Sequence, residues 1–271
     1  LIPEQALGVN KFLSGWNIKE DITVKKGLEI TSPILRFNAH DLKELYYVCD
    51  LLRRFGFTTN ETCGGHIHLG YDYFESPKEL KTFLNIYNEC ENIFYLISNK
   101  ADTKMRKKVD KYAKSFQDKM VSIKNLKVDF DKIKEISEVT ELIRQRVYYI
   151  GLQDFHLSTE RYNGLNLINI GNPEKNTIEF RMPNGEIRFN ELIYNIKLFC
   201  KLLEISKRIA NSNNKELLEQ YYLLFSSDEE TKLNILLDLM FNEEEKEIYR
   251  ERYYKNIKKR NLKIKSNGVR L

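Results

Sequence analysis

Features that would indicate a membrane or secreted protein are missing from this chain of 271 residues. No apolar run is long enough to cross a bilayer, and the first residues show neither a basic segment followed by an apolar one nor a cleavage signal. The four cysteines are scattered without a C-x-x-C spacing, so neither a zinc knuckle nor a disulfide framework is indicated. We therefore expect a cytoplasmic protein.

Common catalytic signatures and linkers are absent as well. The sequence contains neither the H-E-x-x-H motif of zinc proteases nor the G-x-x-x-x-G-K-[ST] motif of nucleotide-binding loops. It also has no internal repeat and no low-complexity linker. A chain of this length suits one catalytic domain with helical additions.

Positive charge is concentrated in the C-terminal tail. The formal net charge is +5, but residues 250–271 hold nine Lys and Arg residues against one acidic residue, Glu251. The rest of the chain has 35 basic and 38 acidic side chains, a balance of −3. Such a tail gives nucleic acid only unspecific, salt-dependent affinity, and it is more often a solvated helix end. Nucleic acid is therefore not the expected partner, and a nucleic-acid-binding protein without catalysis is kept as an alternative.

The pattern of apolar residues predicts helices and short strands. Helices are predicted over residues 41–55, 76–98 and 191–210, with a Lys-rich helical stretch over 102–134 and short helices after about 215. Strands are predicted over residues 27–32, 66–71, 165–170 and 177–183. Asp41 with Glu44 forms a capping box for the first helix, and Ser76 is the cap of the second. This order predicts an α+β domain with a mainly antiparallel sheet and a helical C-terminal part.

Three of the predicted strands have one apolar face and one polar face. Alternate side chains of a strand point the same way, so His66 shares a face with His68, and Glu179 shares a face with Arg181. Glu29 lies on the polar face of the strand over 27–32. If the three strands share a sheet, these polar faces line one concavity.

The residue types on these faces suit a cation and a phosphate. Carboxylates suit Mg²⁺ or Mn²⁺, an imidazole among them leans towards Mn²⁺ or Zn²⁺, and arginine offers a planar fork to phosphate oxygens. A polar strand face that forms only a cross-strand ion pair is a common alternative. Two of only four histidines fall in one glycine-flanked H-x-H motif, which favours a functional site.

The segments WNIKED, LEITSP, TCGGHIHLGYD, RYNGLNL and NTIEFRMPNGEI, in this order, resemble the amidoligases of the glutamine synthetase superfamily. The resemblance covers about residues 16–200 and implies a curved antiparallel sheet, flanked by helices, that holds ATP and divalent cations. It implies that an amino-acid or peptide carboxylate is activated as an acyl phosphate, which an amine attacks to give an amide. We expect a catalytic domain over residues 1–212 and a helical extension with a basic tail over 213–271.

The resemblance also implies roles for individual residues. His66 and Glu179 would be ligands of one metal ion, Mg²⁺ or Mn²⁺. His68 would approach the terminal phosphates of ATP, and Arg181 would stabilise the transferring phosphoryl group. Glu29 would be a further metal ligand or would bind the attacking amine.

Two further residues and one departure complete the comparison with the family. Arg161 and Asn166, in RYNGLNL, would hold the substrate carboxylate or the ribose of the nucleotide, although Asn166 could equally hydrogen-bond a neighbouring strand. The family's domain normally opens with a strand carrying an E-x-E pair, and no such pair occurs before Trp16. We expect that this segment is missing from the chain or that the set of metal ligands is incomplete. A metal-dependent hydrolase or nuclease using the same histidines and glutamates is the rival hypothesis.

Overall fold

A computed structural model describes residues 15–21, 24, 27–100, 112–115, 133–138 and 162–266, with side chains as far as 259. Its elements are β1 (Asn17–Asp21), β2 (Gly27–Thr31), α2 (Ala39–Arg54), β3 (Ile67–Gly70), the short helix η1 (Tyr71–Tyr73), α3 (Pro77–Ile97), β4 (Leu165–Asn166), β5 (Thr177–Phe180), α7 (Phe189–Ala210), α8 (Lys215–Leu223), α9 (Glu229–Met240) and α10 (Glu243–Ser266). This mixture of helices and small antiparallel sheets agrees with the predicted α+β class. The helical stretch predicted over 102–134 lies largely outside the described residues.

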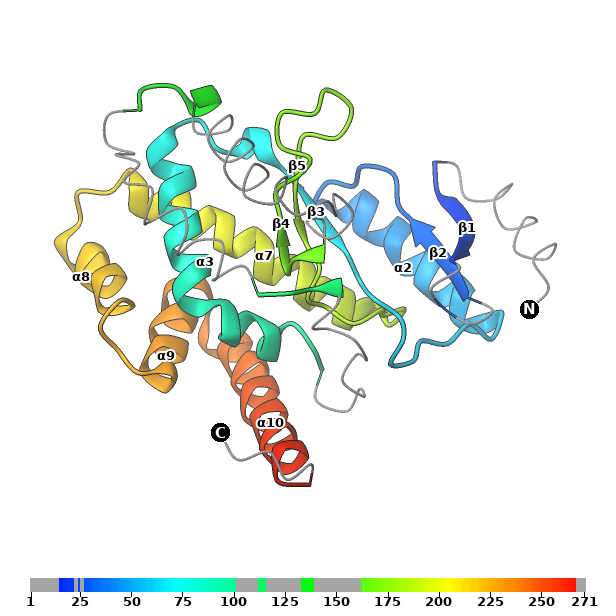
Figure 1. Ribbon diagram of the computed structural model, residues 1–271. Coiled ribbons are helices and arrows are strands. Elements are labelled where there is room, and N and C mark those ends of the chain that lie inside the picture. Colours follow the sequence, from blue (N-terminus) through cyan, green and yellow to red (C-terminus); the bar gives the residue numbers. More distant parts are fainter. Residues whose placement is uncertain are drawn as a thin grey trace, which may run out of the picture.

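The described strands form two separate antiparallel sheets. One contains β1 and β2, with Lys19 opposite Glu29, and the other contains three strands in the order β3-β5-β4. Figure 1 shows the β1–β2 pair beside α2, apart from the three-stranded sheet. The strand that carries Glu29 therefore does not share a sheet with the strands of the other predicted site residues, as the predicted concavity required. β2 pairs instead with β1, a strand that the apolar pattern did not predict.

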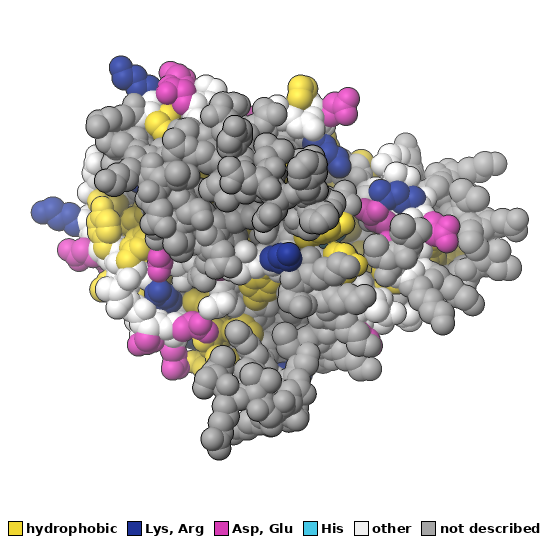
Figure 2. All heavy atoms as spheres, in the orientation of Figure 1, with side chains coloured by type: hydrophobic (Ala, Val, Ile, Leu, Met, Phe, Trp, Pro, Cys, Tyr) yellow, Lys and Arg dark blue, Asp and Glu magenta, His cyan; other side chains and the backbone are white. Residues whose placement is uncertain are grey.

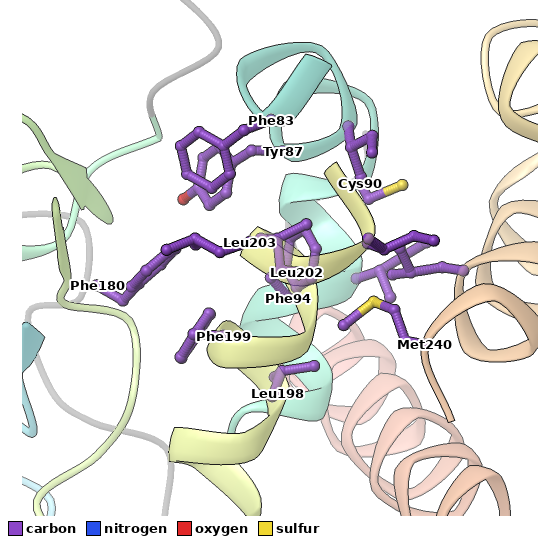
Figure 3. Close-up of a cluster of buried hydrophobic side chains, with 14 of the residues drawn as sticks. Phe83, Tyr87, Cys90, Phe94, Phe180, Leu198, Phe199, Leu202, Leu203 and Met240 are labelled. Atoms are coloured by element: carbon purple, nitrogen blue, oxygen red, sulfur yellow. The ribbon is translucent and has the colours of Figure 1, made fainter. Parts of the chain in front are cut away.

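The central unit consists of α3, α7 and the three-stranded sheet. α3 begins as predicted, since the Ser76 hydroxyl accepts a hydrogen bond from the Glu79 amide at 3.3 Å. The apolar face of β5 packs on both helices, and the ring of Phe180 stacks on Phe199 of α7 with centroids 4.0 Å apart. Phe180 also meets Phe83 of α3 edge to face (Figure 3). Burial of this face turns the alternate side chains of β5 to the opposite side of the sheet.

The helix α2 begins earlier than its predicted capping box. Asn38 is the N-cap, and its side chain accepts a hydrogen bond from the Asp41 amide at 2.9 Å. Glu44, predicted as the second member of the box, instead accepts a hydrogen bond from the Trp16 indole at 2.6 Å. Asparagine is as good a helix cap as aspartate, so the prediction erred by one turn.

The C-terminal helices share the hydrophobic core of the central unit. Leu233 and Leu236 of α9 and Tyr249 of α10 belong to the same buried cluster as the apolar faces of α3 and α7. As predicted, the described residues after 215 contain helices and no strand, but α10 spans 24 residues and is not short. None of the helices in the described ranges is both long and apolar enough to span a membrane. The boundary between residues 212 and 213 stays a prediction.

Candidate active site

Polar side chains from all three strands of the larger sheet form one row. His68 of β3 lies opposite Glu179 of β5, and Asn166 of β4 lies opposite the same glutamate from the other side. In the adjacent row, Ile67 lies opposite Phe180 on the face that packs against the core. The alternation that the sequence predicts thus places the row on the side of the sheet away from the helices.

Glu179 is the centre of this site. Arg181 donates a hydrogen bond to its Oε1 at 2.5 Å, and Asn166 donates to its Oε2 at 2.5 Å. Nδ1 of His66 and Nε2 of His68 lie 3.4 and 3.6 Å from the same Oε1. The carboxylate is only 5% exposed, so a buried negative charge is held by one cation, one amide and two imidazoles.

The two histidines lie at the outer side of the cluster. Their side chains are 30% and 35% exposed, and their contacts with Glu179 are longer than good hydrogen bonds. Burial lowers the pKa of His68 from its usual value of 6.5, and the positive charges of Lys175 and Arg181 lower it further, against the opposing effect of Glu179. Nδ1 of His68 also lies 3.2 Å from the hydroxyl of Thr177. The imidazole of His68 is therefore harder to protonate than a free histidine, and the contact with Thr177 favours one orientation of its ring.

Arg181 is fixed on several sides. Besides its bond to Glu179, its Nε donates to the backbone carbonyl of Tyr112 at 3.4 Å. Its guanidinium lies over the ring of Tyr162, 5.5 Å from the centroid, and that ring meets Tyr112 edge to face at 5.4 Å. A guanidinium held in this way loses little further freedom when it binds an anion.

Glu29 is not part of the cluster. It forms an ion pair with Lys19 across the β1–β2 sheet at 2.9 Å, and its side chain is 40% exposed. Its negative charge raises the pKa of the His68 imidazole, but this effect is smaller than that of Glu179. Arg161, the other residue expected at the nucleotide, lies outside the described residues.

Asn166 is buried and is engaged by the protein through both atoms of its amide. Nδ2 donates to Glu179, and Oδ1 accepts a hydrogen bond from the amide of Ile168 at 3.0 Å. This is the arrangement anticipated by the alternative in which Asn166 bonds a neighbouring strand. Its direct effect is to orient the Glu179 carboxylate.

The glycines before His66 allow a close backbone approach. Gly64 forms a β-bridge with Asn184, and the Gly65 amide donates to the carbonyl of Pro183 at 3.0 Å. A Cβ on Gly65 would lie 2.6 Å from the Asn184 carbonyl oxygen. The protein's own backbone therefore lies close to these glycines, and this contact joins His66 to the segment that follows Arg181.

Several residues around the site carried no signal in the sequence pattern. Thr177 and Lys175 lie in or beside a predicted strand, but nothing in their spacing indicated a contact with His68. Tyr112 lies about 70 residues from Arg181, and its contribution is a backbone carbonyl, which no residue type encodes. Long-range pairing of this kind becomes visible only in the folded chain.

The site lies within the part of the chain that matches a known family. A family model described as "Putative amidoligase enzyme" matches residues 9–203, which include the five strands of the described ranges and the row of polar side chains. The chain belongs to this amidoligase family. The match agrees with the resemblance found in the motifs and ends before α8, α9 and α10. Searches of curated proteins and of solved structures return no match.

The described residues offer donor types that suit the metal ion expected for this amidoligase, but not a complete set of protein ligands. Glu179 and His66 offer an oxygen and a nitrogen close together. Within the described ranges, however, no group of three or more His, Cys, Asp or Glu side chains could hold a metal ion. Mg²⁺ is commonly held by one or two carboxylates together with substrate phosphates, which suits such a partial set.

Proposed function

We propose that this amidoligase is an ATP- and divalent-metal-dependent carboxylate–amine ligase acting on an amino acid or a peptide. The observation that supports this is the convergence of His66, His68 and Arg181 on the single buried carboxylate of Glu179. Cations and neutral donors gathered around one acid are what phosphoryl transfer needs, because its catalysis depends on positioning and on neutralising charge.

In the proposed reaction, an oxygen of the substrate carboxylate attacks the γ-phosphorus of ATP, and the bond from that phosphorus to the ADP oxygen breaks. The amine then attacks the acyl carbon of the acyl phosphate, phosphate leaves, and the amine nitrogen gives up a proton. Arg181 would donate to oxygens of the transferring phosphoryl group. His68 would donate from Nε2 to a terminal phosphate, with the hydroxyl of Thr177 at its Nδ1.

We assign the cation, Mg²⁺ or Mn²⁺, to Glu179 and His66, with Asn166 holding the carboxylate in place. When bound, the cation would neutralise negative charge on the phosphate oxygens. Glu29 suits the attacking amine better than this cation, because it lies on another sheet and is partly exposed beside Lys19. For Arg161 we keep the proposal of contact with the substrate carboxylate or the ribose.

In the described part of the tail, some of the positive charges that could attract nucleic acid are paired with acidic side chains. Arg252 is buried and forms a 2.5 Å ion pair with Glu191, and Lys255 pairs with Glu251. Figure 2 shows described Lys and Arg side chains interspersed with Asp and Glu on one face, not gathered by sign. A surface that attracts nucleic acid gathers positive charge in a patch or stripe.

The test is release of ADP from ATP in the presence of Mg²⁺ or Mn²⁺, a panel of amino-acid and peptide carboxylates, and an amine. We expect release to require both organic substrates and to fall at least tenfold in His66→Ala. His40→Ala is the matched control, because His40 is an exposed histidine of α2. Hydrolysis of a substrate without ATP would instead favour the metal-dependent hydrolase and overturn the proposal.

A further inference from the structure

Asn99 lies two residues after the end of α3 and holds the chain that leaves β5. Its Nδ2 donates to the carbonyl of Met182 at 3.3 Å, and its Oδ1 accepts a hydrogen bond from the amide of Asn184 at 2.7 Å. One side chain thus fixes the backbone on both sides of Pro183. The segment held in this way begins immediately after Arg181.

The segment 182–185 is also hydrogen-bonded to the residues directly before His66. The carbonyl of Pro183 accepts a hydrogen bond from Gly65 at 3.0 Å, and the amide of Gly185 donates to the carbonyl of Cys63 at 2.9 Å. Gly65 immediately precedes His66. A shift of this segment would therefore move His66 and Arg181 relative to the carboxylate that both contact.

The helix α10 holds Asn99 from the other side. Asn256 is buried, and its Nδ2 donates to the carbonyls of Leu96 at 2.7 Å and Asn99 at 2.8 Å. Four residues earlier, Arg252 donates to the carbonyl of Ile97 at 3.2 Å. Side chains of α10 thus satisfy the carbonyls that the end of α3 leaves without helical partners.

Contacts with α7 strengthen the attachment of α10. The Arg252 guanidinium lies 5.2 Å from the ring centroid of Tyr194 of α7 and donates a hydrogen bond to Asn195 of the same helix at 2.9 Å. The helix is therefore fixed to both core helices near the residue that reaches Asn99. Asn256 is thus connected through Asn99 to the segment after Arg181.

We propose that Asn99 is a positioning residue of the active site and that Asn256 of α10, by holding Asn99, helps to set the positions of His66 and Arg181. α10 lies entirely after the residues matched by the family. The affinity measurement below rests on the proposed function, whereas the exchange measurement does not.

The experiment compares Asn256→Ala and Asn99→Ala with Tyr253→Phe in the full chain. Tyr253 is the matched control, because it donates one hydrogen bond from α10 to Glu229 and has no bond to Asn99. Hydrogen–deuterium exchange is followed at the amides of Gly65 and Asn184. We expect both to exchange about 2- to 10-fold faster in the two asparagine variants, the factor that corresponds to one lost hydrogen bond, and to be unchanged in the control.

Affinity for Mg²⁺–ATP is measured by calorimetry on the same proteins, and we expect a several-fold loss in both asparagine variants. The double variant decides whether Asn256 acts through Asn99. If it does, the double variant loses no more affinity than Asn99→Ala alone, because coupled residues do not add.

Unchanged exchange in both asparagine variants, or an equal increase in Tyr253→Phe, would overturn the positioning role. Additive losses in the double variant would overturn the claim that Asn256 acts through Asn99. If the unaltered chain binds no Mg²⁺–ATP, the proposed function fails, and the exchange measurement still decides whether α10 positions the two segments.

Discussion

The two sheets of this amidoligase place a glutamate in very different surroundings. Glu179 of the three-stranded sheet is 5% exposed and contacts four polar side chains, whereas Glu29 of the β1–β2 pair is 40% exposed and pairs with one exposed lysine. The difference follows from what lies behind each strand. β5 packs on α3 and α7, and β2 packs on the smaller clusters around Trp16 and Ile18.

This difference indicates which polar side chains can be held accurately. A large core fixes the backbone of β5, so the alternate side chains of that strand keep one arrangement. Charges in a partly buried site also act more strongly than charges in water. The larger sheet can therefore supply an ordered phosphate site, while Glu29 is suited to a weaker and more adaptable contact.

Substitution of Glu179 by Ala should give the largest effect. Removal of the carboxylate breaks its buried ion pair with Arg181, and breaking such a pair costs about 3–5 kcal/mol. Urea unfolding would measure the loss. The corresponding Glu29→Ala should cost no more than about 1 kcal/mol, because exposed ion pairs contribute little. Equal losses in the two variants would contradict the contrast between the sheets.

Gly65→Ala should have an intermediate effect. The new Cβ would meet the Asn184 carbonyl oxygen at 2.6 Å, and a clash with backbone in a packed region costs about 1–3 kcal/mol. Gly70→Ala at the end of β3 is the control, because a Cβ there meets nothing within 4 Å. Thermal unfolding of the two variants tests this, and a Gly70 variant as unstable as the Gly65 variant would contradict it.

The sequence predicted the strands and faces of the larger sheet because burial imposes a period of two on any strand with one apolar side. His66, His68, Glu179 and Arg181 were grouped on that basis, and the structure brings them together. The position of Glu29 was not predictable, since periodicity reports which face a side chain occupies and not which strand lies beside it. The contact with Tyr112 was hidden for a related reason, because a backbone carbonyl leaves no pattern.

Acidification should produce the smallest effect. Burial lowers the pKa of His68, so between the unfolded value of 6.5 and the lower folded value the unfolded chain binds the proton first. The free energy of unfolding should therefore fall as the pH falls through this window and recover as it rises. His68→Gln removes the titrating group, so its urea midpoint should fall less than that of the unaltered chain between pH 7.5 and 5.5. Parallel curves would show that burial does not lower the pKa of His68 in the folded chain.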